Sequence, residues 1–273
     1  MTTTTNINGS TEDELTKAFK RVELPEGKDF STTSNVTSDE TPAGCSKSAN
    51  PEFYNKAQKY WSEVPATVNG MLGGLGYISA IDIQGSSNFL RELKTLGNKH
   101  ALDCGAGIGR VCKNLLMPRF ATVDMVEQDE NFSKTARDYC TASSESTLSY
   151  LNRLGNIFNI GLQQFCPELD KYDLIWSQWV LGHLTDEDLL LFFRRLRLGL
   201  AKGGYFVIKE NVTSSKKIEL DDVDSSVTRP LKTYEKILCE AGFRIIKTTR
   251  QQSFPKGLYP VYMLACRPVK EVT

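Results

Sequence analysis

Short apolar runs alternate with segments of helical periodicity over most of this chain. The apolar runs predict strands at residues 101–104, 121–127, 157–165, 171–177, 205–209, 243–249 and 259–266. Between them, apolar residues at helical spacing predict helices over 53–61, 86–96, 111–116, 133–150, 186–200 and 231–241. Strands that alternate with helices form a parallel sheet, and the last two strands form a hairpin-like pair that adds an antiparallel strand. The pattern therefore predicts an α/β fold built on one sheet.

The first fifty residues have a different character. Residues 1–50 are rich in Thr, Ser, Asn and Asp and hold few large apolar side chains, too few to offset the entropy of ordering. We expect a disordered tail there, followed by one domain over 51–273. Within the tail, Thr11 and Glu14 have the spacing of a capping box, which predicts a transient or docking helix.

Composition narrows the classes of partner. The 273 residues include 33 Lys and Arg and 33 Asp and Glu, so no net charge attracts nucleic acid or acidic lipid. The chain opens on Met-Thr-Thr-Thr-Thr rather than on a secretion signal, and no apolar run is long enough to cross a bilayer. The seven cysteines contain no Cys-x-x-Cys pair and are interpreted as reduced thiols. We expect a monomer of the cytoplasm and nucleus that binds neither nucleic acid nor membrane directly.

A glycine-rich turn follows the first predicted strand, in the segment Asp-Cys-Gly-Ala-Gly-Ile-Gly-Arg over 103–110. Gly105 and Gly107 can take positive φ and let backbone N–H groups approach a ligand at a helix N-terminus. A dinucleotide fingerprint would need glycine at position 110, where this chain has Arg110. Glu127 ends the second strand about 20 residues downstream, where an acidic side chain can bind ribose hydroxyls or simply face solvent. A cofactor is the expected ligand of this turn.

Further polar residues follow the later strands. The fourth strand leads into Gln178, Trp179 and His183, at the edge of the sheet where the glycine turn also lies. His183 could accept a proton there or have a structural role. The fifth strand leads to Asn211 and then to four carboxylates within 219–224. That segment is either a solvated loop or a binding element, and it lacks the ligand pattern of an EF-hand, so we predict no metal site.

Two segments precede the sheet. The first predicted helix carries an aromatic stripe that includes Tyr60 and Trp61, which alone would more often be core than ligand wall. Residues 67–77 are rich in glycine and predict a mobile or ligand-contacting loop that could act as a lid.

In combination, these segments resemble the eukaryotic protein α-N-terminal methyltransferases, which are class I S-adenosylmethionine (SAM)-dependent enzymes. The matching segments are Tyr60-Trp61, 68–74, 102–110, 161–163, Gln178-Trp179, 182–185, 209–211 and 221–226, so the resemblance covers the chain from about residue 51 onward. It implies a Rossmann-like seven-stranded class I methyltransferase sheet with helices on both faces and N-terminal helical additions. It also implies SAM as the cofactor, and protein N-termini reading X-Pro-Lys or X-Pro-Arg after methionine removal as substrates. Ribosomal and chromatin proteins are the partners it suggests.

The resemblance further implies the residues of the site. Cofactor contacts are expected at Gly105, Gly107, Arg110, Glu127, Leu162, Gln163, Gln178 and Trp61, with the methionyl carboxylate near Arg110. Substrate contacts are expected at Tyr60, Trp61, Leu72, Trp179, Leu258 and Tyr259, and the catalytic set is Asp224, His183, Asp221 and Asn211. The family has Asp where this chain has Glu127, so the longer side chain must place its carboxylate differently.

Physical chemistry is consistent with these roles. A protein α-amine has a pKa near 8 and must lose a proton before it can attack a methyl group, so a base is needed. Asp224 and His183 fit that role, while Asp221 and Asn211 can hold the amine in line. Trp179 offers a flat surface to proline, and the acidic segment suits a basic third residue. A small-molecule amine N-methyltransferase and a catalytically silent peptide-binding module remain the alternatives.

Overall fold

The structure is a computed structural model, and it describes residues 50–142 and 149–269. The predicted tail up to residue 49, including the capping box at Thr11 and Glu14, lies outside the described residues. Within the described ranges, no helix has the length and apolar character that a membrane span requires.

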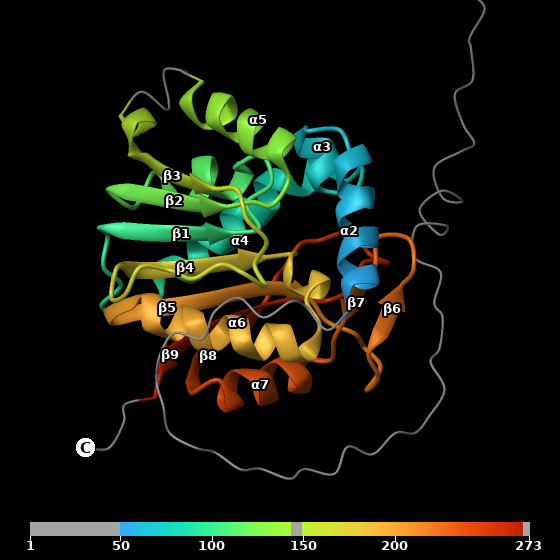
Figure 1. Cartoon of the computed structure of the whole chain (residues 1–273). Helices are drawn as coiled ribbons and strands as arrows, with labels where there is room; N and C mark the ends of the chain where they lie inside the picture. The colour runs from blue at the N-terminus through green and yellow to red at the C-terminus, as the bar shows by residue number, and fades with distance from the viewer. Residues whose placement is uncertain (1–49, 143–148, 270–273) are drawn as a thin grey trace, which may run out of the picture.

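Within the described residues, seven strands form one mixed sheet in the order β3-β2-β1-β4-β5-β9-β8 (Figure 1). The strands are β1 His100–Cys104, β2 Thr122–Val126, β3 Leu154–Phe158, β4 Tyr172–Gln178, β5 Leu200–Asn211, β8 Phe243–Arg250 and β9 Val261–Pro268. β1 to β5 run parallel, and β9 is antiparallel to both β5 and β8. The chain reverses its direction of winding between β1 and β4, and a crevice is expected at the carboxyl ends of these two strands.

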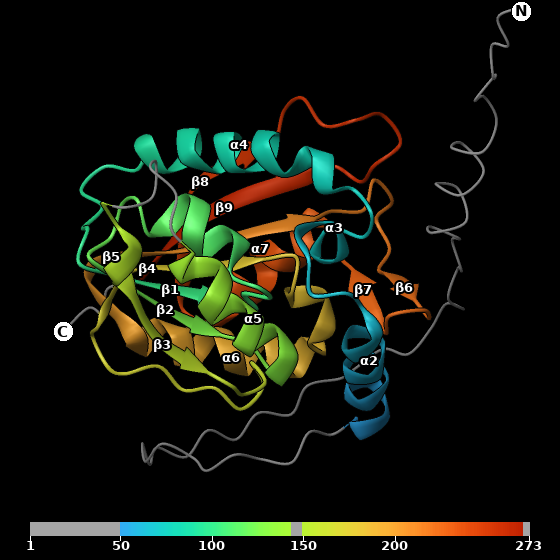
Figure 2. The same cartoon turned by 90° about the horizontal axis from the view of Figure 1, so that it is seen from above.

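Helices cover both faces of this sheet (Figures 1 and 2). One face packs against α4 Ser79–Arg91, the π-helical turn η2 Cys112–Leu116 and α5 Glu130–Thr141, and the other against α6 Asp186–Gly199 and α7 Leu231–Glu240. Because neighbouring strand residues point to opposite faces, Ala101 and Trp176 are buried in the first layer, and Leu102 and Ile175 in the second. The predicted fold class is confirmed.

The N-terminal additions lie beyond the carboxyl ends of the strands (Figure 1). They are α2 Pro51–Glu63, α3 Val68–Met71 and the 3-10 turn η1 Gly76–Ile78. The Asn50 side chain accepts from Phe53 N at the start of α2, which is the usual N-cap arrangement. Tyr54 then donates to Asp188 Oδ2 at 2.5 Å and so fastens α2 to α6.

The acidic segment forms a small hairpin of β6 Glu219–Asp221 and β7 Ser226–Thr228. This hairpin lies near α2 in both views (Figures 1 and 2). Asp224 is therefore in the hairpin turn, on the same side of the molecule as the ends of the parallel strands.

Several predicted boundaries were wrong. The helix expected over 86–96 is α4, which begins at Ser79, because Asp82 and Ser86 are polar yet fully buried and hide its inward face from the apolar pattern. The third strand ends at Phe158, since the apolar residues up to 165 pack inward from turns rather than from a strand. The helix expected over 133–150 is α5, which ends at Thr141. The glycine-rich loop over 67–77 contains α3 and the first two residues of η1.

Candidate active site

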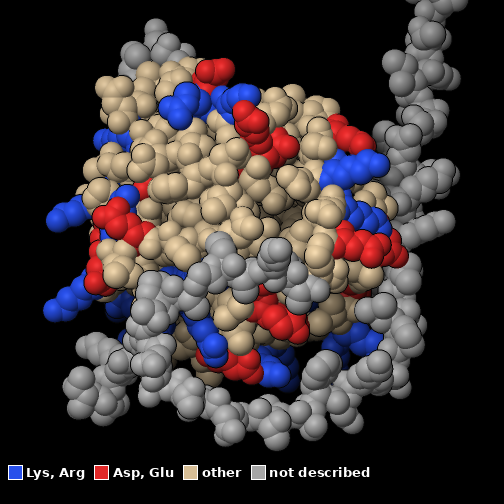
Figure 3. All heavy atoms as spheres, in the orientation of Figure 1, with Lys and Arg blue, Asp and Glu red and all other residues tan. Residues whose placement is uncertain are grey.

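A first cavity opens at the carboxyl ends of β1, β2 and β4, and its empty space of about 1020 Å³ includes open solvent at the mouth. All the residues predicted to contact the cofactor line it, namely Trp61, Gly105, Gly107, Arg110, Glu127, Leu162, Gln163 and Gln178. On the face seen in Figure 3, a hollow lies between α2 and α5, and basic and acidic side chains are interspersed around it. The structure thus brings this predicted set together, while the role of each residue remains a prediction.

The glycine turn requires residues without a Cβ atom. Gly105 has φ +68° and Gly107 has φ +56°, and both conformations strain other residues. A Cβ at Gly105 would overlap the side chain of Val180, and one at Gly107 would lie 2.6 Å from Met71 Sδ. The N–H groups of Gly105 and Ala106 both donate to Val126 O, which folds the turn against the end of β2. The turn can therefore approach a ligand closely.

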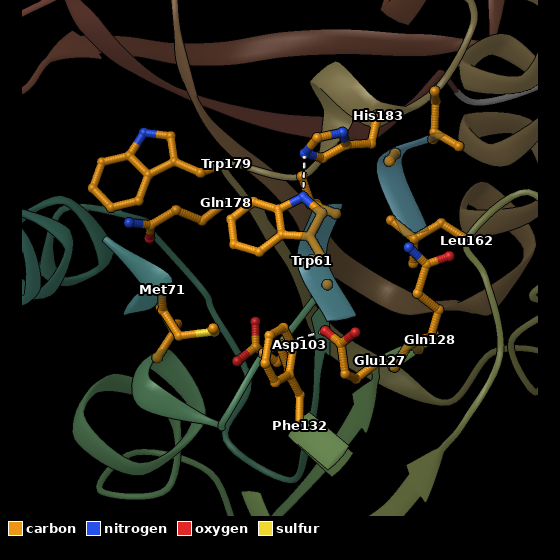
Figure 4. Close-up of a pocket in the computed structure, with 18 of the residues that line it drawn as sticks. Trp61, Met71, Asp103, Glu127, Gln128, Phe132, Leu162, Gln178, Trp179 and His183 are labelled. Atoms are coloured by element: carbon orange, nitrogen blue, oxygen red, sulfur yellow. Dashed lines mark hydrogen bonds between the residues drawn. The ribbon is translucent and has the colours of Figure 1, made fainter. Parts of the chain in front are cut away.

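Two carboxylates face the first cavity in Figure 4, those of Glu127 and Asp103. Glu127 Oε2 accepts from Gly107 N at 2.8 Å and Oε1 from Asp129 N at 2.9 Å, and burial raises the pKa of this carboxyl despite those bonds. Burial also raises the pKa of Asp103 to about 7, and its Oδ2 makes no hydrogen bond within the described residues. A ribose diol at Glu127 and an ammonium group at Asp103 would fit these acceptors, so the cavity suits SAM.

Arg110 and Gln178 are held by a residue that sequence reasoning missed. Asp82, on α4, is fully buried, and its Oδ2 lies 2.8 Å from Arg110 Nη1. Gln178 Nε2 donates to both oxygens of Asp82 at 2.9 Å, and Gln178 Oε1 accepts from Trp176 Nε1 at 3.1 Å. The orientation of the amide and of the guanidinium is thereby fixed. Asp82 carried no sequence signal, because its neighbours Ile81 and Ile83 indicate nothing about partners that lie far away in the sequence.

A second cavity adjoins the first. Of the residues predicted for substrate binding and catalysis, it is lined by Trp61, Leu72, Trp179, His183, Asn211, Asp224, Leu258 and Tyr259. Tyr60 and Asp221 do not line its wall. The ring of Tyr60 packs edge-on against Trp61, and Asp221 Oδ1 accepts from Val223 N at 2.8 Å within the hairpin turn.

Both cavities share a wall formed by Trp61, Met71, Trp179 and His183. Trp179 has φ +54°, an uncommon value outside glycine, and the residues after it are held by Glu210. Glu210 Oε1 accepts from Val180 N and from Leu181 N, each at 2.9 Å. Glu210 lies in the matching segment 209–211, but the sequence analysis assigned it no role. In the structure it lines the second cavity and supports this wall.

The two predicted bases lie near each other, His183 in the shared wall and Asp224 in the second cavity. His183 Nε2 accepts from Trp61 Nε1 at 2.9 Å, as Figure 4 shows, and lies 4.0 Å from Asp224 Oδ2. A ring nitrogen that accepts carries no proton, so the proton of neutral His183 belongs on Nδ1. Burial lowers the pKa of His183, against the opposing charge of Asp224, and burial raises the pKa of Asp224. Asp224 Oδ1 is buried and accepts no hydrogen bond from the described residues, so this oxygen has an unused capacity to accept a proton.

Strand order, glycine turn, acidic residue after β2 and the cavity above them define a class I SAM-dependent methyltransferase. A family model described as AdoMet-dependent proline di-methyltransferase matches residues 49–267, and the chain belongs to this family. SAM is its cofactor, as the sequence predicted.

Individual relatives agree with this assignment. The chain is 65% identical over 220 residues to alpha N-terminal protein methyltransferase 1 of Drosophila melanogaster, covering 81% of this chain and 78% of the relative. It is 46% identical over 221 residues to N-terminal Xaa-Pro-Lys N-methyltransferase 1 of Homo sapiens, covering 79% and 96%. Among solved structures, a SAM-dependent methyltransferase from Leishmania major superimposes with a TM-score of 0.73 at 36% identity, covering 79% of this chain and 83% of the other.

Proposed function

We propose that this protein transfers methyl groups from SAM to the α-amino group of protein N-termini that read Xaa-Pro-Lys or Xaa-Pro-Arg. The observation that carries the proposal is the second cavity, which joins the first at a shared wall and is lined by Asp224, whose buried Oδ1 has no hydrogen-bond partner within the described residues. The names of the relatives, which include N-terminal Xaa-Pro-Lys N-methyltransferase 1, support the same substrate class.

The residues of the first cavity would hold the cofactor, which supplies an electrophilic methyl group on its sulfonium. Arg110 would bind the methionyl carboxylate, Glu127 the ribose hydroxyls, and Gln178 would be fixed beside them by Asp82. Binding the cofactor in one orientation beside the shared wall fixes where the amine has to arrive.

The residues of the second cavity would prepare the amine. An α-amine with a pKa near 8 arrives mostly protonated at neutral pH, and Asp224 would take that proton. Asn211 would orient the first peptide group, and Trp179 would present its ring to the proline. His183, held by Trp61, would position Asp224 from 4.0 Å away.

Charge favours a peptide over a small amine. The hairpin that contributes Asp224 also carries Glu219, Asp221 and Asp222, and this cluster can attract a basic third residue. We further propose that the protein acts as a monomer in the cytoplasm and nucleus, with ribosomal and chromatin proteins among its substrates. The equal numbers of basic and acidic residues support recognition by local charge.

The test is incubation with SAM and a short Xaa-Pro-Lys peptide, followed by mass spectrometry. A mass gain in steps of one methyl is expected, and the number of steps reads the multiplicity. The matched control is the same peptide with an acetylated N-terminus, which keeps the lysine amine but blocks the α-amine. Methylation of the acetylated peptide would contradict α-amino specificity. Peptide binding without any mass gain would favour the silent binding module, and methylation of a small amine such as ethanolamine in place of the peptide would favour the other alternative.

A further inference from the structure

Lys209, near the end of β5, is fully buried and surrounded by acceptors. Its Nζ lies 2.5 Å from Asp82 Oδ1, 3.1 Å from Asp82 O, 2.9 Å from Ser86 Oγ and 2.8 Å from Gln251 Oε1. The Ser86 hydroxyl donates to Asp82 O, so toward Lys209 it acts as an acceptor. An ammonium group has three protons to donate, whereas a neutral amine has only two, and its lone pair would face another acceptor. The surroundings therefore select the charged form of Lys209.

Asp82 is shared between two cations. Its Oδ1 pairs with Lys209, and its Oδ2 lies 2.8 Å from Arg110 Nη1. One carboxylate between two cations leaves this group with a net charge of one positive unit. Burial lowers the pKa of Lys209, and the positive charge of Arg110 lowers it further, while the negative charge of Asp82 raises it. A further anion would balance this net positive charge.

That anion can enter from the first cavity. Arg110 lines the cavity and is 4% exposed, while Lys209 and Asp82 are sealed behind it. Only Nη1 of the guanidinium donates within the described residues, to Asp82 and Ser79, which leaves its other nitrogens for a ligand. Asp103 lies near Arg110, but its pKa of about 7 leaves it only partly ionised at neutral pH, and it is placed for the ammonium of the same ligand.

We propose that Lys209 is a positioning residue for the cofactor's methionyl carboxylate, acting through Asp82 and Arg110. Because Lys209 neutralises Asp82, the charge of Arg110 stays available to the carboxylate. Without Lys209, Asp82 and Arg110 would form a neutral buried pair, and the carboxylate would enter a site with no net attraction. In a buried site of low dielectric constant, that difference of one charge is large. The inference rests on the proposed location of the carboxylate at Arg110.

The experiment compares two ligands that differ by the carboxylate alone. S-adenosylhomocysteine (SAH) and decarboxylated SAH are titrated calorimetrically into the full-length protein, and the ratio of their affinities measures carboxylate recognition. In Lys209→Met we expect SAH to bind roughly ten-fold or more weakly, with little change for decarboxylated SAH. The matched control is Lys171→Met, since Lys171 also pairs with a buried carboxylate, Asp124 at 2.9 Å, but does not line the cavity. The control should leave the ratio unchanged.

A second variant separates charge from packing. The double variant Asp82→Asn with Lys209→Met removes one charge of each sign and returns the net charge to one positive unit. We expect its affinity ratio to recover toward the wild-type value, although more of the network is gone. A wild-type ratio in Lys209→Met, or a double variant no better than the single one, would overturn the inference. If Lys209→Met does not fold, the double variant alone tests the inference. Equal affinities of the double variant for SAH and decarboxylated SAH would then overturn the inference. If the wild-type protein binds both ligands equally, the carboxylate is not at Arg110, and the proposed cofactor arrangement is wrong instead.

Discussion

Replacing Asp224 by Asn tests the proton transfer most directly. The change keeps the size of the side chain and an oxygen acceptor but removes the charge and nearly all the basicity. Asp224 lines the second cavity and its buried Oδ1 has no hydrogen-bond partner within the described residues, whereas the Nε2 of His183 accepts from Trp61 at 2.9 Å. No neighbouring base is therefore ready to substitute. We expect kcat to fall by about 10²–10⁴, the usual cost of losing a general base, with a smaller change in peptide affinity.

The pH dependence gives this prediction its sharpest form. The variant must wait for substrate that is already neutral in solution, so below about pH 8 its rate should rise roughly ten-fold per pH unit. The wild-type profile should be flatter, because Asp224 removes the proton on the enzyme. Removing the charge of Asp224 also withdraws the influence that raises the pKa of His183, so His183 becomes a weaker base.

The assay is steady-state kinetics with an Xaa-Pro-Lys peptide from about pH 6.5 to 9.5, a range that brackets the amine pKa. Asp222→Asn is the matched control, since Asp222 is an exposed carboxylate in the same hairpin and lines neither cavity. It should leave kcat unchanged, and any effect should fall on KM, because Asp222 belongs to the acidic cluster that is proposed to attract the basic third residue. Near-wild-type kcat for Asp224→Asn across the whole range would refute the assignment and require another proton acceptor.

Three further changes test other parts of the site. Gly105→Ala places a Cβ atom at a residue with φ +68° and against Val180, so the SAM affinity measured by calorimetry should fall more than about ten-fold. Unchanged affinity would mean that the turn does not contact the cofactor. Burial raises the pKa of Glu210 from 4.5 to about 7, so the wild-type protein should lose up to about 3 kcal/mol of stability as the pH rises through that window. Thermal melts of Glu210→Gln should lack that loss, and parallel curves for both proteins would contradict it. Trp61→Phe removes the N–H group that donates to His183 Nε2. Because that hydrogen bond stabilises the neutral ring, the pKa of His183 measured by NMR should rise. An unchanged pKa would show that Trp61 does not fix the tautomer.

The strands and the first cavity were predictable because their signals are local. Each buried parallel strand is a short apolar run, and β1 and β2 end directly before Gly105 and Glu127, two residues that line the first cavity. Parallel strands present their carboxyl ends at one edge, so residues far apart in sequence, such as Arg110 and Gln178, could be expected together. The residues of the second cavity were predicted from the family resemblance, because residue spacing alone left their roles open.

The residues that sequence reasoning missed act through tertiary contacts. Asp82 and Lys209 neutralise each other in the interior, and nothing in their neighbours predicts the partner, which lies 127 positions away. The hairpin β6–β7 has strands of three residues, too short for an alternation to be recognised. Asp221 was predicted to hold the substrate amine, and that role stays a prediction; its Oδ1 accepts from Val223 N in the turn, a local bond that a short polar side chain readily makes.

The shared wall would link the binding of the cofactor to the binding of the peptide. Trp61, Met71, Trp179 and His183 each form part of both cavities, so a ligand that orders these side chains in one cavity changes the surface that the other ligand meets. If the bound cofactor changes the affinity for the peptide by some factor, the bound peptide changes the affinity for the cofactor by the same factor, because a coupling free energy is reciprocal. An inhibitor that spans Trp61 would draw on both cavities at once, and its affinity would exceed what either half achieves when the other site is empty.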